Sequence, residues 1–285
     1  MYNFEDSKFD AQLNFMPWAQ IINPRFDDQG IKPYGLAIKM SNAQAVGLVP
    51  DETFECIEYS FSSGKEEVLI SMKPRISVVS KGALYIKERE TGVKVGLLRD
   101  NYDLFSSDKL RYKTYNRCVI FLFGSNGALL HEQPLQITLS GASGASFNKA
   151  YAAYDRGMLS GGFAYDLQTA YSSFREQKPS GKGQLFYAHG IFCPIFDCEE
   201  KVVGDNTFAI ATVADYEHPT ATNLSQYLIR NGTPESNIIT ENFEKHKDFG
   251  KETAIGAPST RPMATVSSGF NQSYGDEDDD SIPWG

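Results

Sequence analysis

The chain has 285 residues, of which 41% are apolar and 13% aromatic, enough to bury one large core or two modest ones. Its net charge of -9 includes five consecutive acids near the C-terminus, so the rest is nearly balanced and no bulk basic charge indicates a nucleic-acid partner. Four cysteines are too few for a disulfide scaffold, and the longest apolar run is far too short to cross a membrane. The composition therefore predicts a protein of the reducing cytoplasm with no membrane partner.

The first half of the chain is rich in strand-like segments. Residues 1–28 mix aromatic and acidic side chains, and we favour packing of these aromatics into a core over contact with bases. Short strands separated by glycine-containing turns then predict a mainly β (α+β) fold. It is either an OB-like Greek-key barrel or another small β-barrel or sandwich, with a few added helices. The predicted strands are residues 35–40, 45–49, 53–61, 67–72, 75–80, 83–88 and 93–98.

The second half combines further strands with helices. Two apolar runs, residues 116–123 and 135–139, flank Asn126-Gly127, which is a strong hairpin signal. Residues 145–156 have apolar side chains at helical spacing. The remaining candidates are strands at 184–196 and 206–214, an acidic turn between them, and helices at 223–230 and 235–249.

A local basic surface stands out from this acidic chain. Between Lys65 and Arg117 there are twelve Lys or Arg against seven acids, a local charge of about +5. If residues 109–117 are extended, alternate positions place four cations and one tyrosine on one face. Such a row can follow a phosphate backbone, and its tyrosine can stack on a base, which is worth about 1–3 kcal/mol per base. The alternative is an ordinary solvated strand face. The predicted DNA-binding residues are Lys73, Arg75, Lys87, Arg89, Lys109, Arg111, Tyr112, Lys113, Tyr115 and Arg117.

Another basic stretch, residues 175–182, is punctuated by glycine and flanked by aromatic residues. Two interpretations are equally favoured. It is either a mobile loop over a DNA groove or a plain surface connection.

Metal and catalytic signals are weak. His189, Cys193 and Cys198 lie within ten residues, but they supply only a loose half-site for zinc, with His218 distant. A half-buried strand that uses cysteine as a small apolar residue is the favoured interpretation, and whether zinc binds is left open. None of the four histidines lies beside a recognisable nucleophile. We therefore predict no enzyme activity, no cofactor and no metal.

The chain ends in a change of composition. Residues 1–250 are the predicted β-rich body, either single or divided into two subdomains near residues 140–160. Residues 251–275 are rich in Gly, Ser, Thr and Pro and predict a flexible linker. Residues 276–285 join five acids to a short apolar tip, so they cannot fold alone and predict a disordered acidic tail that docks on a partner.

The tip Asp278-Asp279-Asp280-Ser281-Ile282-Pro283-Trp284-Gly285 resembles the C-terminus of bacterial and phage single-stranded DNA-binding proteins. That family ends in several Asp followed by Ile-Pro-Phe, and the match covers about ten of the 285 residues. Here a serine is inserted, tryptophan replaces phenylalanine, and a glycine moves the terminal carboxylate beyond the aromatic ring. The tip residues that match the family's partner-binding motif are Asp278, Asp279, Asp280, Ile282, Pro283 and Trp284.

This resemblance implies an OB-fold body that coats single-stranded DNA without sequence preference. It also implies a tip that recruits replication, recombination and repair enzymes, and a cytoplasmic location on the nucleoid. The alternative is a non-enzymatic interaction protein, phage- or plasmid-like, whose tail docks a partner and whose body binds no nucleic acid. A homo-oligomer, and a preference for RNA over DNA, are left open by the sequence.

Overall fold

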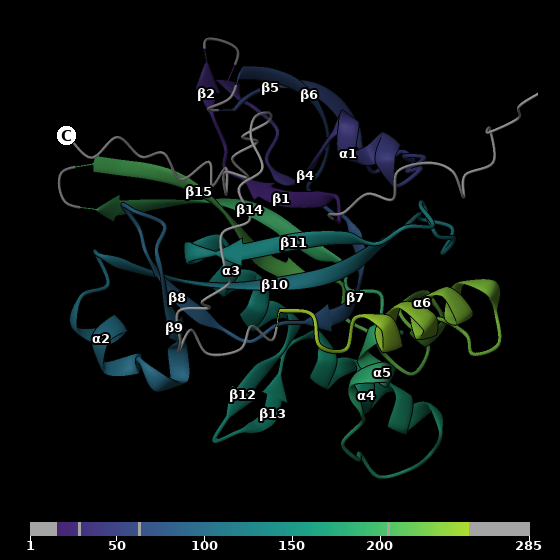
Figure 1. Ribbon diagram of the computed structural model, residues 1–285. Helices are drawn as coiled ribbons and strands as arrows, with labels where there is room; N and C mark the ends of the chain where they lie inside the picture. Colours follow the sequence, from purple (N-terminus) through teal and green to yellow (C-terminus); the bar gives the residue numbers. More distant parts are fainter. Residues whose placement is uncertain (1–15, 28–29, 62–63, 204–205, 251–285) are drawn as a thin grey trace, which may run out of the picture.

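The computed structural model describes residues 16–27, 30–61, 64–203 and 206–250 (Figure 1). The predicted linker 251–275 and the tip 276–285, with Asp278, Asp279, Asp280, Ile282, Pro283 and Trp284, lie outside the described residues. In the described ranges, no helix has both the length and the apolar character needed to span a membrane.

One large mixed sheet dominates the described residues. Its strand order is β5-β6-β4-β1-β11-β10-β8-β9, and β7 also pairs with β10. Strand β1 joins the two halves of the sheet, because it pairs antiparallel with β4 and parallel with β11. The strands are β1 (Trp18–Ile22), β4 (Gly35–Lys39), β5 (Glu55–Phe61), β6 (Gly64–Ser71), β7 (Arg75–Lys81), β8 (Tyr85–Glu88), β9 (Lys94–Leu97), β10 (Tyr112–Phe123) and β11 (Leu135–Ser140).

The prediction of a mainly β protein with a few helices is confirmed. Along the described strands, the path of pairing begins at β5 and ends at β9 without those two strands meeting, so this sheet is not a closed barrel. Three separate hairpins, two short and one long, complete the described strands. They are β2 (Phe26–Asp27) with β3 (Gly30–Ile31), β12 (Ala153–Asp155) with β13 (Met158–Gly161), and β14 (Pro194–Val203) with β15 (Asn206–Tyr216).

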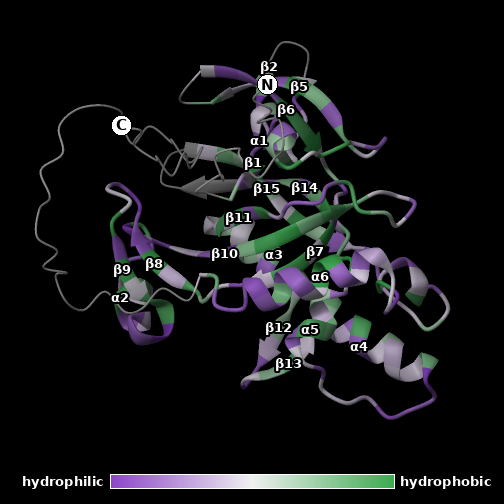
Figure 2. Cartoon of the chain, turned by 45° about the vertical axis from the view of Figure 1, so that its right-hand side comes forward, coloured by the Kyte–Doolittle hydropathy of each residue, from purple (hydrophilic) through white to green (hydrophobic). Residues whose placement is uncertain are grey.

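Strand β10 is the centre of the core. All six residues of its C-terminal half, from Cys118 to Phe123, are buried, and Figure 2 shows this strand as one of the most hydrophobic in the molecule. Its antiparallel partner on one edge is β11, as the Asn126-Gly127 signal predicts. On the other edge β7 pairs with the buried half, and β8 pairs with Tyr112 to Tyr115. One strand therefore connects the core to the basic segment of the chain.

The helices pack around this sheet. The main core cluster contains residues from Ala19 to Ile239. Helix α6 begins where its cap requires, because the Thr233 hydroxyl accepts a hydrogen bond from the Ser236 amide and a proline follows at the first position. The helices are α1 (Met40–Ala45), α2 (Tyr102–Ser107), α3 (Gly141–Tyr151), α4 (Phe163–Phe174), α5 (Gln184–Ala188) and α6 (Pro234–Lys245).

Several predicted elements are wrong, and tertiary contacts explain two of them. Residues 45–49 are the end of α1 and a turn rather than a strand; the Asn42 amide donates to the Trp18 carbonyl and holds α1 against β1. Residues 184–196 begin as helix α5, which the His189 side chain stabilises through its hydrogen bond to the Leu185 carbonyl. Residues 223–230 contain only a short 3-10 helix at Leu224–Gln226. Of the acidic turn expected at residues 197–205, the part from 197 to 203 lies within β14.

A buried histidine beside β10 makes the fold sensitive to acid. The His131 ring stacks on Phe121 with centroids 5.2 Å apart, and its Nε2 accepts a hydrogen bond from the Leu122 amide at 2.9 Å. Its Nδ1 lies 2.6 Å from the Gln133 carbonyl oxygen, to which it donates. Burial lowers the pKa of His131 from 6.5 to about 4, because the charged ring would lose its hydration.

We predict that the free energy of unfolding falls as the pH drops from 6.5 towards 4, by about 3 kcal/mol at most from this group. Between these pH values the unfolded chain binds a proton at His131 and the folded chain does not. The contribution of His131 to the free energy of unfolding is therefore complete above pH 6.5 and is lost progressively as the pH falls to about 4. In urea unfolding across this range, the free energy of unfolding should fall less steeply with decreasing pH for His131→Gln than for the wild type. Titration of the His131 ring by NMR is the independent check, and a folded-state pKa near 6.5 would contradict the prediction.

Candidate nucleic-acid interface

Strands β8, β9 and the N-terminal half of β10 form an arm that projects with α2 from one side of the sheet (Figure 1). The register places Lys87 opposite Lys113 and Tyr85 opposite Tyr115, and Lys94 of β9 lies opposite Lys87. Directly opposed residues share a face of a sheet. We call this set, Tyr85, Lys87, Lys94, Lys113 and Tyr115, the lysine–tyrosine face.

The two tyrosines of this face stack on each other and lie close to ammonium groups. The ring centroids of Tyr85 and Tyr115 are 5.7 Å apart with an interplanar angle of 28°. The Nζ atoms of Lys87 and Lys94 lie 5.3 Å and 6.0 Å from the Tyr115 centroid. A cation over a ring face is attracted by the ring quadrupole. The arrangement thus combines cations with aromatic surfaces, as single-stranded nucleic-acid sites do.

Much of the lysine–tyrosine face is buried. Lys87 and Lys113 are only 2% and 4% exposed, and Tyr112, Tyr85 and Tyr115 are also buried. Burying an ammonium group is costly unless it is paired. A strand of DNA could therefore meet this face only if the face is first uncovered.

An exposed basic rim borders the arm. Strand β10 begins at Tyr112, so Lys109 and Arg111 lie in the preceding turn and do not continue the expected alternation. Arg111 Nε donates to Glu88 Oε1 at 2.6 Å, and its guanidinium lies 5.3 Å from the Tyr112 centroid. Arg89 Nε donates to the Lys109 carbonyl oxygen at 3.4 Å. The strands therefore bring Arg89, Lys109 and Arg111 together at one end of the arm.

The other predicted DNA-binding residues lie elsewhere. Arg117 shares the β10 face of Lys113 and Tyr115, but its guanidinium is 5.2 Å from the Phe249 centroid, beyond the arm. Lys73 is exposed in the turn between β6 and β7. Arg75 begins β7 and belongs to a different surface, described next.

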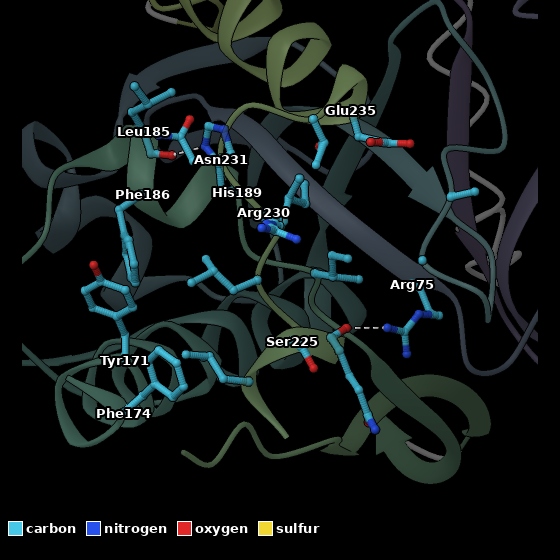
Figure 3. A pocket seen from close by; sticks show the side chains of 18 of the residues that line it. Arg75, Tyr171, Phe174, Leu185, Phe186, His189, Ser225, Arg230, Asn231 and Glu235 are labelled. Atoms are coloured by element: carbon cyan, nitrogen blue, oxygen red, sulfur yellow. Dashed lines mark hydrogen bonds between the residues drawn. The ribbon is translucent and has the colours of Figure 1, made fainter. Parts of the chain in front are cut away.

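A groove of about 1380 Å³ opens between α4, α5, α6 and residues 221–231. Figure 3 shows the rings of Tyr171, Phe174 and Phe186 on one side, Arg75 on the other, and Arg230 between them. Arg75 is fixed in place, since its guanidinium donates to the Gln226 carbonyl and lies 3.5 Å from a Glu217 carboxylate oxygen. We call this cavity the aromatic groove.

Among the residues that line this groove, the sequence analysis named only Arg75 as DNA-binding. The sequence held one signal for the other groove residues, because two of its aromatic residues, Phe174 and Phe186, flank the basic stretch 175–182. Tyr85 and Lys94 of the arm were also missed. Pairing of β8 with β10 brings Tyr85 into the face, and pairing of β9 with β8 brings Lys94. Both pairings could have been sought from the hairpin signals at residues 81–92.

The residues considered for zinc are held apart. His189 joins α5 to α6, with Nδ1 donating to the Leu185 carbonyl at 2.8 Å and Nε2 lying 3.1 Å from the Ser236 hydroxyl. Cys193 is buried, and the His218 ring lies between the carboxylates of Asp166 and Asp215 at 2.8 Å and 3.2 Å. Among the described residues, no cluster of three or more His, Cys, Asp or Glu could hold a metal ion.

The comparison with protein families gives one match. A family model described as a domain of unknown function, DUF5895, matches residues 13–261. The chain belongs to this family. The match spans both the lysine–tyrosine face and the aromatic groove and ends before the tip at 276–285. Comparisons with curated proteins and with solved structures give no match.

The cysteines allow a chemical test of this arrangement. Burial raises the pKa of the Cys118 and Cys193 thiols to about 12, whereas Cys56 is exposed. Iodoacetamide at about pH 8 should therefore alkylate Cys56 first and reach Cys118 and Cys193 only after unfolding, as followed by peptide mass spectrometry. The urea-unfolded chain is the control. Faster labelling of Cys193 and Cys198 after a zinc chelator would instead indicate a metal site.

Proposed function

We propose that this DUF5895 protein binds single-stranded DNA without sequence preference and recruits replication, recombination or repair enzymes through residues 276–285. The observation that supports the proposal is the lysine–tyrosine face, where Lys87 and Lys94 lie 5.3 Å and 6.0 Å from the Tyr115 ring. Because this face is buried, DNA would bind the exposed rim first and reach the rings once the face is uncovered. The resemblance of the tip to single-stranded DNA-binding proteins supports it independently. Such a role would place the protein on the nucleoid in the cytoplasm.

The proposed contact is electrostatic and aromatic, so it does not read sequence. Every base has a flat face, and stacking on a ring is worth about 1–3 kcal/mol whichever base is bound. Phosphates would meet the rim formed by Arg89, Lys109 and Arg111. An OB-like barrel is the fold that the tail resemblance implies, but this contact needs only β8, β9 and the start of β10.

The acidic tip has a second proposed role. Its five carboxylates and a DNA backbone are both polyanions, so they would compete for the same cations. If residues 251–275 act as the predicted linker of 25 residues, their coil span would be roughly 25–30 Å, which would allow such competition within one chain. Capture of the tip by an enzyme would then free the cations for DNA.

The first test is binding of a labelled oligonucleotide across a salt series. We predict that the logarithm of the association constant falls linearly with the logarithm of salt concentration, by about 0.7 per phosphate contacted. Affinity for the single strand should exceed that for a duplex of the same length. A flat salt response, or equal affinity for the two forms, would show the proposal to be wrong.

Charge reversal on the rim tests the location of the site. Lys109→Glu together with Arg111→Glu should lower affinity at least tenfold and reduce the salt slope, because two cations near the phosphates become anions. Both positions are exposed, but Arg111→Glu replaces the ion pair with Glu88 by two neighbouring carboxylates, so circular dichroism of the variant checks that it is folded. Lys65→Glu is the matched control, since Lys65 is exposed on β6, outside the arm. An equal loss of DNA affinity in the control and the rim variant would contradict the location of the site at the rim.

Removal of residues 276–285 tests the tail. DNA affinity should stay the same or increase, with the gain largest at low salt, because a competing polyanion is lost. Weaker binding of the truncated protein to the same oligonucleotide would contradict the proposed role.

One observation favours the alternative of an interaction protein. The arm exposes apolar side chains, and Tyr102 and Leu110 are 59% and 70% exposed. Exposed apolar groups that gather on a projecting element can mark a contact with another protein. If the wild type fails to bind single-stranded DNA even at low salt, this alternative becomes the better account.

A further inference from the structure

The aromatic groove has an unusual wall. Tyr171 and Phe174 lie three residues apart on α4, and Phe186 comes from α5. The centroids of Tyr171 and Phe186 are 5.3 Å apart at an interplanar angle of 62°, so their faces point in different directions. Phe174 is 61% exposed beside them (Figure 3). A flat ligand can stack on such rings and remove apolar surface from water.

Cations border this wall. Arg230 is exposed, and no carboxylate among the described residues forms an ion pair with it. Lys182 Nζ lies 5.2 Å from the Tyr171 centroid, and the segment 175–182 carries three cations against one acid. Glu235 is the only carboxylate among the described residues that line the groove. The margin of the groove therefore favours an anion.

Size and chemistry together identify the occupant. At about 1380 Å³ the groove is larger than the roughly 300–1,000 Å³ of ordinary small-molecule pockets, so it can hold a segment of a polymer. Flat rings favour bases, and Arg230 and Lys182 favour phosphates. The Arg75 guanidinium is already engaged by the Gln226 carbonyl and Glu217. Ser225, Gln226 and Asn231 add polar groups that can hydrogen-bond to base edges without fixing a sequence.

We infer that the aromatic groove is a second binding site for single-stranded DNA, with bases on Phe174 and Phe186 and phosphates at Arg230 and Lys182. The inference rests on the proposed function, and it extends the path of the strand from the arm to the helical side of the protein. It also assigns the segment 175–182 to the margin of a DNA site.

Photocrosslinking of the full-length protein tests the inference directly. An oligothymidylate in which 5-iododeoxyuridine replaces several thymidines reacts with aromatic side chains that stack on it. Peptide mass spectrometry should find crosslinks at Phe174 or Phe186. If the wild type binds the oligonucleotide but crosslinks map only to the arm, the groove inference is wrong and the proposed function stands. If the wild type does not bind at all, both are wrong.

Matched variants give a second readout. Phe174→Ala should weaken oligonucleotide binding between about 5-fold and 100-fold, and Arg230→Gln should weaken it and lower the salt slope by about 0.7. Both residues are exposed, so folding should be preserved. The controls are Tyr154→Ala, an exposed tyrosine on β12, and Lys247→Gln beyond α6. Affinities equal to those of the controls would overturn the inference.

A competing occupant is tested with the same variants. A synthetic peptide of residues 276–285 also joins an aromatic ring to negative charge. Suppose that this peptide binds the wild type and that Phe174→Ala weakens peptide binding but leaves oligonucleotide binding unchanged. The groove is then a peptide site and the inference is wrong.

Discussion

The structure depends on how one strand, β10, is paired along its two edges. β11 holds one edge, while β7 and β8 divide the other between the buried half and the polar half. The pairing with β7 places Phe121 opposite Ser77 in the core, and the pairing with β8 places Lys113 opposite Lys87. Because side chains alternate between faces, a slip of one residue in this register would exchange the lysines for their neighbours on the opposite face.

The arm and the aromatic groove each bring cations and aromatic rings together, and different elements position them. In the arm they come from adjacent strands, whose register sets the spacing between Tyr85 and Tyr115. In the groove they come from helices α4 and α5 and from the segment that follows β15. The helices are held by a polar contact, because the His189 side chain links α5 to Ser236 on α6. The aromatic rings of both arrangements therefore stand on regular elements, which hold side chains more firmly than loops do, whereas Arg230 and Lys182 lie outside helices and strands.

The sequence predicts local features well where they depend on neighbours in the chain. Alternation and glycine turns locate most strands of residues 35–123, and Asn126-Gly127 marks the turn before β11. Burial is harder to predict, because Lys87 and Lys113 look like surface residues until three-dimensional packing covers them. The groove is harder still. Its parts come from β7, α4, α5 and residues 221–240, and no spacing in the sequence brings Arg75 near Phe186.

The parallel pairing of β1 with β11 has a consequence for how the chain folds. Trp18 and Gln136 are partners in this ladder, although most strands of the sheet lie between them along the chain. Closing so long a loop costs chain entropy before the contacts that repay it can form. During synthesis β1 cannot pair with β11 until residues 135–140 have left the ribosome. The hairpins of residues 55–97 are local and can form earlier, so the join between the two halves of the sheet is expected to be a late step in folding.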